Sequence, residues 1–536
     1  MIWKKKDKST SVQEVVERNS GMKISEFLTP KRNPYLFNLD KATARIKDAI
    51  RNREQITVVT DYDCDGITSA AIMYLLFAAL KTTVRIRLPK RFSEGYGLSE
   101  KIIDEIDCSK KGLLITVDNG IAAYNEIRTA KERGLDVIVI DHHITNAELP
   151  PANIIIDPHI VGKNEFKDYC GAGLAYRLAQ SFEIDENVMK KITGIAAIGT
   201  VADVVPLVGD NRNIVIDGLK YLNDGYLTSG LKSLLEQLKA TNIDESFLGF
   251  SLAPIFNAQG RLFDNGASIS YRLLASESNN AEKLNGISNR LIETNNTRKT
   301  VVSNGYDSMR PEIENAVRDK ISAIVVRVKD VGEGVIGILA GKIAEETHRP
   351  CFVFTDSENK GVLKGSGRTY GNINIKAILD KITPECYVKY GGHPGAAGVS
   401  LHHDKFNQFQ KEFLQYCNEI SDFNFDTVYY DLEIEPKEIN SIFEEVKRYA
   451  PYGEGNNSIL FRVKNFVPTE KFGAKYRAIG ENHIKLFGLC NDAVGFGLYD
   501  KFKEKEEQGK WDLLGDMSEN TFNGKTSIQF IFRDIQ

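Results

Sequence analysis

The feature that most constrains the fold is an alternation of short β-branched runs with helical segments between residues 41 and 157. Strands that alternate with helices favour a largely parallel, doubly wound α/β sheet. Ligands of such sheets bind beyond the carboxyl ends of the strands, so the residues that follow each strand matter most. The expected strands are Ile56–Thr60, Thr83–Leu88, Gly112–Val117, Asp136–Ile140 and Asn153–Ile156.

Acidic residues and histidines follow three of these strands. A further carboxylate, Asp203, lies in the otherwise apolar segment 198–205. Burying a carboxylate is costly without a partner, and a metal ion is one such partner. The strand-end residues are Asp61, Asp63 and Asp65 after the first strand, Asp118 after the third, and Asp141, His142 and His143 after the fourth.

Each acidic motif alone has a simpler interpretation. An Asp-rich turn is typical of a solvated loop or a helix N-cap, and adjacent histidines can serve packing and hydrogen bonding. As a set, five or more aspartates with at least one histidine suit two divalent ions, with manganese or magnesium favoured over zinc. Two such ions can activate water and stabilise an in-line attack on phosphorus.

The chain of 536 residues is long enough for two to four domains. A long polar helix is expected to join two α/β units, and short strands with turn signals towards the end predict a small all-β barrel. The expected parts are an N-terminal extension (1–40), a first α/β domain (41–267), a connecting helix (268–310), a smaller α/β domain (311–420) with a Gly-rich turn at Gly332–Gly337, and the barrel (425–536).

Composition sets limits on the class of protein. A formal net charge of −4 neither indicates nor excludes a nucleic-acid-binding protein, since bound cations would neutralise an acidic centre. The 7 cysteines form no CxxC pair, which favours buried free thiols in a reducing cytoplasm. No apolar run is long enough to span a membrane, and the lysine-rich start does not resemble a secretory signal.

The four acidic motifs, in this order, resemble those of the DHH phosphoesterase superfamily. The resemblance implies that Asp63, Asp65, His142 and Asp203 are ligands of two metal ions, with Asp118 bridging them. It also implies that Asp141 orients the site and that His143 contacts phosphate or acts as general acid. Some members carry a histidine ligand at the position of Val59, and Asp61 is the residue expected to replace it.

The second half resembles the domain associated with DHH proteins. Gly-rich loops alone often reflect turn geometry, but the resemblance implies that two motifs bind substrate. Backbone amides of the glycines could approach a phosphate, and Arg368 offers a bidentate fork. The residues concerned are Ser366 and Arg368 in the first motif, and Gly391, Gly392 and His393 in the second.

Three further segments narrow the resemblance to the RecJ family of exonucleases. They are Leu88–Gly97 with Arg91, Asn257–Leu262 with Asn257 and the catalytic Arg261, and the region from about residue 425, which resembles an OB-fold. The resemblance implies a metal-dependent enzyme that degrades single-stranded DNA from the 5′ end, in recombination and repair. OB-folds combine basic and stacking residues, for which the candidates are Lys471, Lys475, Tyr476, Arg477 and Lys485.

Other functions remain open at this point. A DHH phosphodiesterase of short oligonucleotides or cyclic dinucleotides is the main alternative, followed by a non-catalytic relative and a pyrophosphatase. The partners that the resemblance implies are single-stranded DNA, a single-strand-binding protein and a RecQ-type helicase. We expect a cytoplasmic monomer that does not bind membranes.

Overall fold

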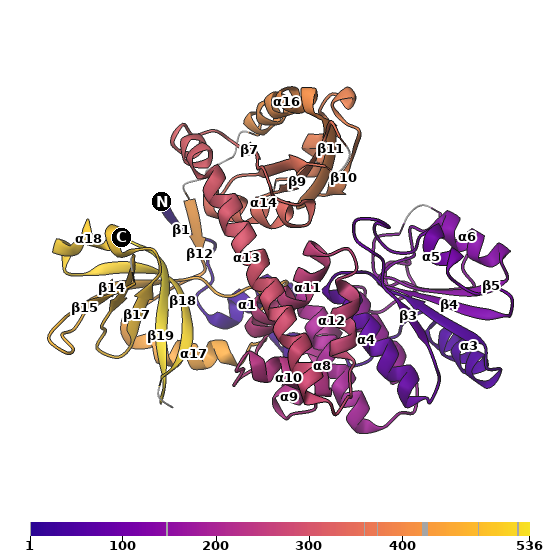
Figure 1. Ribbon diagram of the computed structural model, residues 1–536. Helices are drawn as coiled ribbons and strands as arrows, with labels where there is room; N and C mark the ends of the chain where they lie inside the picture. The colour runs from indigo at the N-terminus through magenta and orange to yellow at the C-terminus, as the bar shows by residue number, and fades with distance from the viewer. Residues whose placement is uncertain are drawn as a thin grey trace.

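The computed structural model describes residues 2–145, 148–357, 360–371, 373–420, 427–480, 482–522 and 525–536. Figure 1 shows a parallel sheet with its helices on the right, a second sheet at the top and a third sheet on the left. A central group of helices lies between the first and third sheets, and the long helix α13 runs upward from it to the second sheet.

The first sheet confirms the predicted parallel α/β fold. Its order is β3-β2-β4-β5-β6, and every neighbouring pair is parallel. The central strands are buried along almost their whole length because helices cover the sheet, as is usual for parallel sheets. The bounds are β2 (Gln55–Val59), β3 (Arg85–Arg87), β4 (Gly112–Val117), β5 (Leu135–Ile140) and β6 (Ile154–Ile156).

Helix α4 (Cys64–Ala79) joins this sheet to the central helices. It is apolar on nearly every side because it packs against α7 (Gly171–Gln180) and α8 (Glu186–Ala202) as well as the sheet. The chain continues through α9 (Gly209–Asn223), α10 (Ser229–Gln237), the π-helix η1 (Phe247–Leu252) and α11 (Ala253–Leu262).

The prediction of one connecting helix over residues 268–310 was wrong. The structure has two helices, α12 (Ala267–Leu274) and α13 (Ala281–Arg318). The residues between the two helices are polar, and their backbone and side-chain groups form hydrogen bonds that replace those of a continuous helix. The Ser276 carbonyl accepts from Gly230 N at 3.0 Å. The Asn280 side chain accepts from Lys283 N at 3.0 Å and caps the second helix.

The second sheet is mixed, in the order β10-β11-β9-β8-β7. Its strands are β7 (Ile324–Arg327), β8 (Cys351–Asp356), β9 (Val362–Arg368), β10 (Lys389–His393) and β11 (Ala396–His402), and it packs against α14 (Glu333–Thr347) and α16 (Phe406–Asn418).

The Gly-rich turn expected at Gly332–Gly337 was also wrong, because α14 begins at Glu333. Close packing explains these glycines. A Cβ atom on Gly334 would lie 2.2 Å from the Arg261 carbonyl oxygen, so no larger residue fits there without a shift.

The C-terminal region forms one sheet in the order β13-β14-β18-β19-β17-β16-β15. Its end strands do not pair with each other within the described residues, so the sheet is not a closed barrel. The region also contains two helices that the sequence analysis did not anticipate, α17 (Ile439–Lys447) and α18 (Tyr499–Lys503). The strands are β13 (Leu432–Ile434), β14 (Phe461–Phe466), β15 (Tyr476–Ile479), β16 (His483–Leu486), β17 (Asp492–Gly495), β18 (Trp511–Phe522) and β19 (Lys525–Ile535).

The N-terminal segment packs against this C-terminal sheet. Strand β1 (Ile2–Lys5) pairs in parallel with β12 (Thr427–Tyr430), and the Trp3 indole donates to Asp534 Oδ2 at 2.9 Å. Valines of α1 (Val12–Ser20) and Phe27 from α2 (Ile24–Leu28) belong to the core of the C-terminal region. The extension is therefore part of that core.

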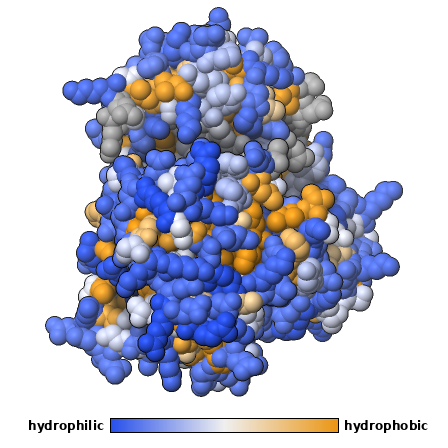
Figure 2. Space-filling view, turned by 90° about the vertical axis from the view of Figure 1, so that its right-hand side faces the viewer, coloured by the Kyte–Doolittle hydropathy of each residue, from blue (hydrophilic) through white to orange (hydrophobic). Residues whose placement is uncertain are grey.

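The described helices include none that is both long enough and apolar enough to cross a membrane. The face in Figure 2 is mainly hydrophilic, with separate hydrophobic patches across its middle. The 7 cysteines are free, and five of them are buried.

The contact between N- and C-terminal residues predicts a large effect of Phe27→Ala. The Phe27 side chain is fully buried, and the Arg212 guanidinium lies 4.1 Å from its ring centroid. We expect the free energy of unfolding of the C-terminal region to fall by about 3–5 kcal/mol, measured by urea denaturation. The control is Leu28→Ala, since Leu28 is 45% exposed. This substitution should change the free energy of unfolding by less than about 0.5 kcal/mol. Equal losses in both variants would contradict the prediction.

Candidate metal and phosphate site

The turn after β2 places three aspartates at the carboxyl edge of the first sheet. Asp63 caps α4 and accepts from Gly66 N at 3.1 Å. Asp65, in the first turn of α4, accepts from Gly171 N at 2.7 Å and Ala172 N at 2.8 Å. The turn closes only around a glycine, because a Cβ atom on Gly66 would lie 2.3 Å from the Asp61 carbonyl oxygen.

His142 is the centre of the cluster. Its Nε2 atom lies 3.0 Å from Asp118 Oδ1, 3.7 Å from Asp65 Oδ2 and 3.7 Å from Asp203 Oδ2. Asp118 and His142 follow neighbouring parallel strands, whereas Asp203 ends α8. Elements distant in the sequence thus meet at one point.

The cluster forms three overlapping groups whose ligand atoms lie within 4.8 Å of one another. The group that contains Asp118, His142 and His143 shares Asp118 with one of the other groups and His142 with the other, which is the arrangement expected of two neighbouring cation positions. They are Asp61, Asp63 and Asp118; Asp65, His142 and Asp203; and Asp118, His142 and His143. One buried oxygen, Asp61 Oδ1, has no hydrogen-bond partner within the described part of the chain.

The electrostatics of the cluster fit divalent cations. Burial raises the pKa of Asp118 well above its usual range, and the charges of Asp65 and Asp63 raise it further. Burial, with neighbouring carboxylates, likewise raises the pKa of Asp61 and of Asp203. Burial lowers the pKa of His142, which favours the neutral imidazole that can bind a metal. A hard cation would remove the repulsion among these carboxylates.

A series of hydrogen bonds through Asp141 holds His143 beside the cluster. Its Nδ1 atom lies 2.7 Å from Asp141 Oδ1, and Asp141 Oδ2 accepts from Ile121 N at 2.8 Å. Burial opposes the charged form of His143, but the hydrogen bond to Asp141 prevails and raises the pKa of this histidine. The Tyr96 hydroxyl donates to the Asp118 carbonyl at 2.9 Å and lies 3.3 Å from both ring nitrogens of His143.

Arginines gather on the other side of the site. Burial lowers the pKa of Arg261 to about 10, and the charges of Arg91, Arg298 and Arg368 add to this effect. The Arg261 guanidinium donates to the Gly334 carbonyl at 3.1 Å, and Arg91 lies 4.7 Å above the Tyr62 ring. Close, repelling arginines are typical of an anion-binding site.

Helix α14 connects the arginines of the two α/β domains. Gly334 packs on Arg261, and one turn later a Cβ atom on Gly337 would lie 3.1 Å from both Arg368 Nη2 and Ser366 Oγ. Ser366 and Arg368 end β9, where the guanidinium contacts Ser366 Oγ at 3.3 Å. Asn257 lies at the base of the site, where its Oδ1 accepts from Cys64 N at 2.9 Å.

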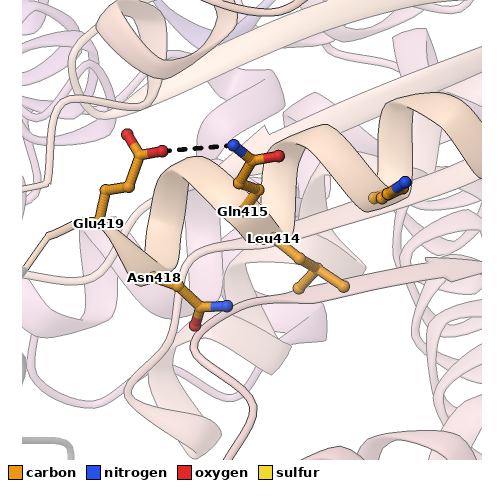
Figure 3. A pocket seen from close by; sticks show the side chains of 5 residues that line it. Leu414, Gln415, Asn418 and Glu419 are labelled. Atoms are coloured by element: carbon orange, nitrogen blue, oxygen red, sulfur yellow. Dashed lines mark hydrogen bonds between the residues drawn. The ribbon is translucent and has the colours of Figure 1, made fainter.

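The contacts of the cluster do not include Gly391, Gly392 or His393. These residues lie on the exposed edge strand β10, where His393 pairs with Ala396 of β11. The His393 side chain forms no hydrogen bond or ion pair with another described residue. A surface hollow lies elsewhere in the same domain, on α16, and contains none of the predicted site residues (Figure 3).

Two side chains of the site received no role from the sequence. Tyr96 stands in a segment that was singled out, yet its contact with His143 depends on the path of the loop. Arg298 is one of several polar residues of α13, and no local pattern distinguishes it. Only the approach of α13 to α11 gives it a place beside Arg261.

Comparison with known proteins agrees with this geometry. The DHH family N-terminal domain matches residues 55–200, the DHHA1 domain residues 320–419, and the RecJ OB domain residues 430–534. The fold and the carboxylate cluster define a phosphoesterase of the DHH class, which confirms the resemblance seen in the sequence.

Whole-chain relatives narrow the class further. Single-stranded-DNA-specific exonuclease RecJ from Escherichia coli is 30% identical over 532 residues, which cover 93% of this chain and 90% of that protein. Crystal structures of RecJ from Thermus thermophilus in complex with Mn²⁺ and Mg²⁺ match with TM-scores of 0.80 and 0.72, at 28% and 25% identity. These matches cover 97% of this chain and 75% and 74% of those chains. The chain belongs to the RecJ family.

The carboxylate cluster predicts opposite effects of Asp118→Asn with and without metal. A pKa raised above the usual value of 3.8 means stability that is complete at low pH and lost as pH rises through the folded-state pKa. The metal-free protein should therefore lose thermal stability as the pH rises above the usual value of 3.8, and Asp118→Asn should lose less. Asparagine also tolerates the left-handed backbone of Asp118 (φ 63°).

Added Mn²⁺ should reverse this order. It should raise the melting temperature of the wild type at pH 7.5 and that of Asp118→Asn much less, as measured by calorimetry. A metal-free variant less stable than the wild type, with an undiminished response to Mn²⁺, would contradict the assignment.

Proposed function

We propose that this protein is a metal-dependent exonuclease that hydrolyses single-stranded DNA from the 5′ to the 3′ end, in recombination and repair. One observation carries the proposal: a buried carboxylate–histidine cluster lies beside arginines that repel one another. Such a pair of sites suits a substrate with a scissile phosphodiester at the first and a further phosphate at the second.

The proposed ligands of two manganese or magnesium ions are the residues of the cluster. Bound cations of this kind supply Lewis acidity, which activates water at neutral pH and neutralises charge on phosphate oxygens. Asp61 is the proposed replacement for the family histidine at Val59, because it groups with Asp63 and Asp118. The full proposed set is Asp61, Asp63, Asp65, Asp118, His142 and Asp203.

His143 is the proposed proton donor or phosphate contact. Asp141 holds its Nδ1 atom at 2.7 Å, which fixes the ring and leaves Nε2 for a phosphate oxygen or the leaving oxygen. The hydrogen bond to Asp141 raises the pKa of His143, which favours the protonated imidazole. Asp141 accepts from Ile121 N and holds His143, and it belongs to none of the groups of possible metal ligands. Its proposed role is therefore to orient the imidazole of His143.

The arginines support the proposed action at the end of a strand. A terminal phosphate carries more negative charge than an internal diester, so a group of unpaired cations favours the end of a strand. Arg261, Arg91 and Arg368 are proposed to hold the 5′ phosphate together with Ser366, and Asn257 to support the turn that carries Asp63. Gly391, Gly392 and His393 are proposed to contact the strand from the exposed edge of β10.

The proposed parts act as units: residues 41–267 bind metal, residues 311–420 bind phosphate through α14 and β9, and residues 425–536 bind the incoming strand. Residues 268–310 are proposed to connect the two α/β units. Residues 1–40 are proposed to stabilise the C-terminal region by packing against it. We also propose a monomer that works in the cytoplasm with a single-strand-binding protein and a RecQ-type helicase.

The five residues of the C-terminal sheet that were predicted to bind single-stranded DNA differ in whether they already have a partner within the protein. Lys471 and Lys485 each lie 3.0 Å from Asp492, and the Tyr476 hydroxyl donates to Glu506 at 2.5 Å. Lys475 and Arg477 are exposed and have no such partner among the described residues, so these two are the proposed principal contacts.

The proposal is tested by digestion of long single-stranded DNA with Mn²⁺. We expect degradation of a strand blocked at its 3′ end and none of a strand blocked at its 5′ end. Asp203→Ala should lower kcat by at least about 100-fold because it removes a ligand. The matched control is Asp307→Ala, since Asp307 is exposed and its one ion pair within the described part of the chain is with Arg310. Cleavage of dinucleotides without cleavage of long strands would instead favour the small-phosphodiesterase alternative.

Arg368→Gln tests the phosphate site separately. We expect KM to rise about 10- to 100-fold for a strand with a 5′ phosphate, because a charge-assisted hydrogen bond is lost. The KM for a strand with a 5′ hydroxyl should change little, so the preference between the two ends should collapse. An equal rise in KM for both strands would place Arg368 on an internal phosphate.

A further inference from the structure

Two large apolar side chains are exposed beside the metal cluster. Val204 follows Asp203 directly and is 65% exposed, and Phe250 on η1 is 83% exposed. Neither belongs to a hydrophobic core of the protein. Exposed apolar groups that lie next to a functional site need a reason other than packing.

The backbone conformation of Val204 is a second reason to look for a function at this position. Its φ angle is 60°, in the left-handed region that glycine and asparagine tolerate and that β-branched residues avoid. The residue is therefore strained and also exposes its isopropyl group, so the fold gains nothing from a valine here. A strained position of this kind points to function.

Phe250 lies on the same flank of the site. A Cβ atom on Gly249 would lie 3.4 Å from Val201 Cγ1, so η1 packs on the last turn of α8. Val204 N donates to the carbonyl of the same Val201 at 3.3 Å. Val201 therefore contacts both Val204 and Gly249, the residue before Phe250. Helix η1 is a π-helix, a rare conformation found often at functional sites.

The chain segment that carries Val204 joins the metal cluster to a contact with the C-terminal region, and η1 follows a second contact with that region. On one side, Asp203 belongs to the cluster. On the other side, Leu207 N donates to the Glu454 carbonyl at 2.7 Å. Tyr452 N also donates to Glu245 Oε1 at 2.8 Å, just before η1. A strand that passes from the C-terminal region to the metal cluster along this flank would cross Val204 and Phe250.

We propose that Val204 and Phe250 form a contact surface for unpaired nucleobases of the strand as it enters the metal site. This inference rests on the proposed function and adds to it a site for bases, whereas the arginines serve phosphates. A phenyl ring and an isopropyl group offer no hydrogen bond, so they accept every base equally. An enzyme that degrades strands of any sequence needs such a contact without base preference. Paired bases would not present their faces to this surface.

The test uses 5′-phosphorylated oligonucleotides in which a window of abasic nucleotides is placed at successive positions. For the wild type, KM should rise about fivefold or more when the window reaches the nucleotides at this surface, since one base stack is lost. For Phe250→Ala, KM on the normal strand should rise by a similar factor, and the window should then have no further effect. The kcat at saturation should be unchanged in both cases.

Val204→Gly separates contact from folding. Glycine adopts the left-handed backbone freely, so the melting temperature should stay the same or rise while KM rises. Val161→Ala is the matched control, since Val161 is 91% exposed and belongs to none of the groups of possible metal ligands, and the KM of this variant should not change.

Phe250→Ala and Val204→Gly enzymes with wild-type KM, or with an undiminished effect of the abasic window, would overturn the inference. Exposed apolar residues that serve a protein partner would give that result. Failure of the proposed function is distinguishable, because the wild type itself would then not digest any single strand.

Discussion

Electrostatic repulsion among buried carboxylates is the constraint on which the rest of the structure depends. Asp61, Asp118 and Asp203 meet in a space from which the protein excludes most water, and each has a raised pKa for that reason. Such an arrangement survives only on a rigid support. The parallel sheet supplies that support from below, while α4, α7 and α8 supply it from the sides.

The same support explains the distribution of glycines. Gly66 allows the turn after β2 to close, and Gly334 allows α14 to touch Arg261. Gly337, one turn further along α14, leaves room for Arg368. The arginine side of the site is thus assembled across two domains by close backbone contacts, so small movements of α14 would shift both arginines together.

The sequence predicted the parts of this structure that depend on local patterns. Strand periodicity gave the parallel sheet, and the strand-end position of Asp118 and His142 predicted their meeting, since parallel strands end at one edge. Contacts between distant segments were out of reach, as with Arg298 beside Arg261 and Tyr96 beside His143. The single connecting helix failed because the break at Ser276–Asn280 is set by hydrogen bonds to Gly230 and to the next helix. The domain boundaries and the roles of the individual site residues stay predictions.

The contact between Trp3 and Asp534 joins residues that are 531 positions apart. During synthesis the valines of α1 emerge early, but the strands that cover them, β14 and β18 among them, emerge last. A ribosome-bound chain must therefore keep the three valines of this helix uncovered for most of its elongation, and exposed apolar side chains are what chaperones recognise. The contact between Trp3 and Asp534 can therefore form only after the first parallel sheet has been synthesised.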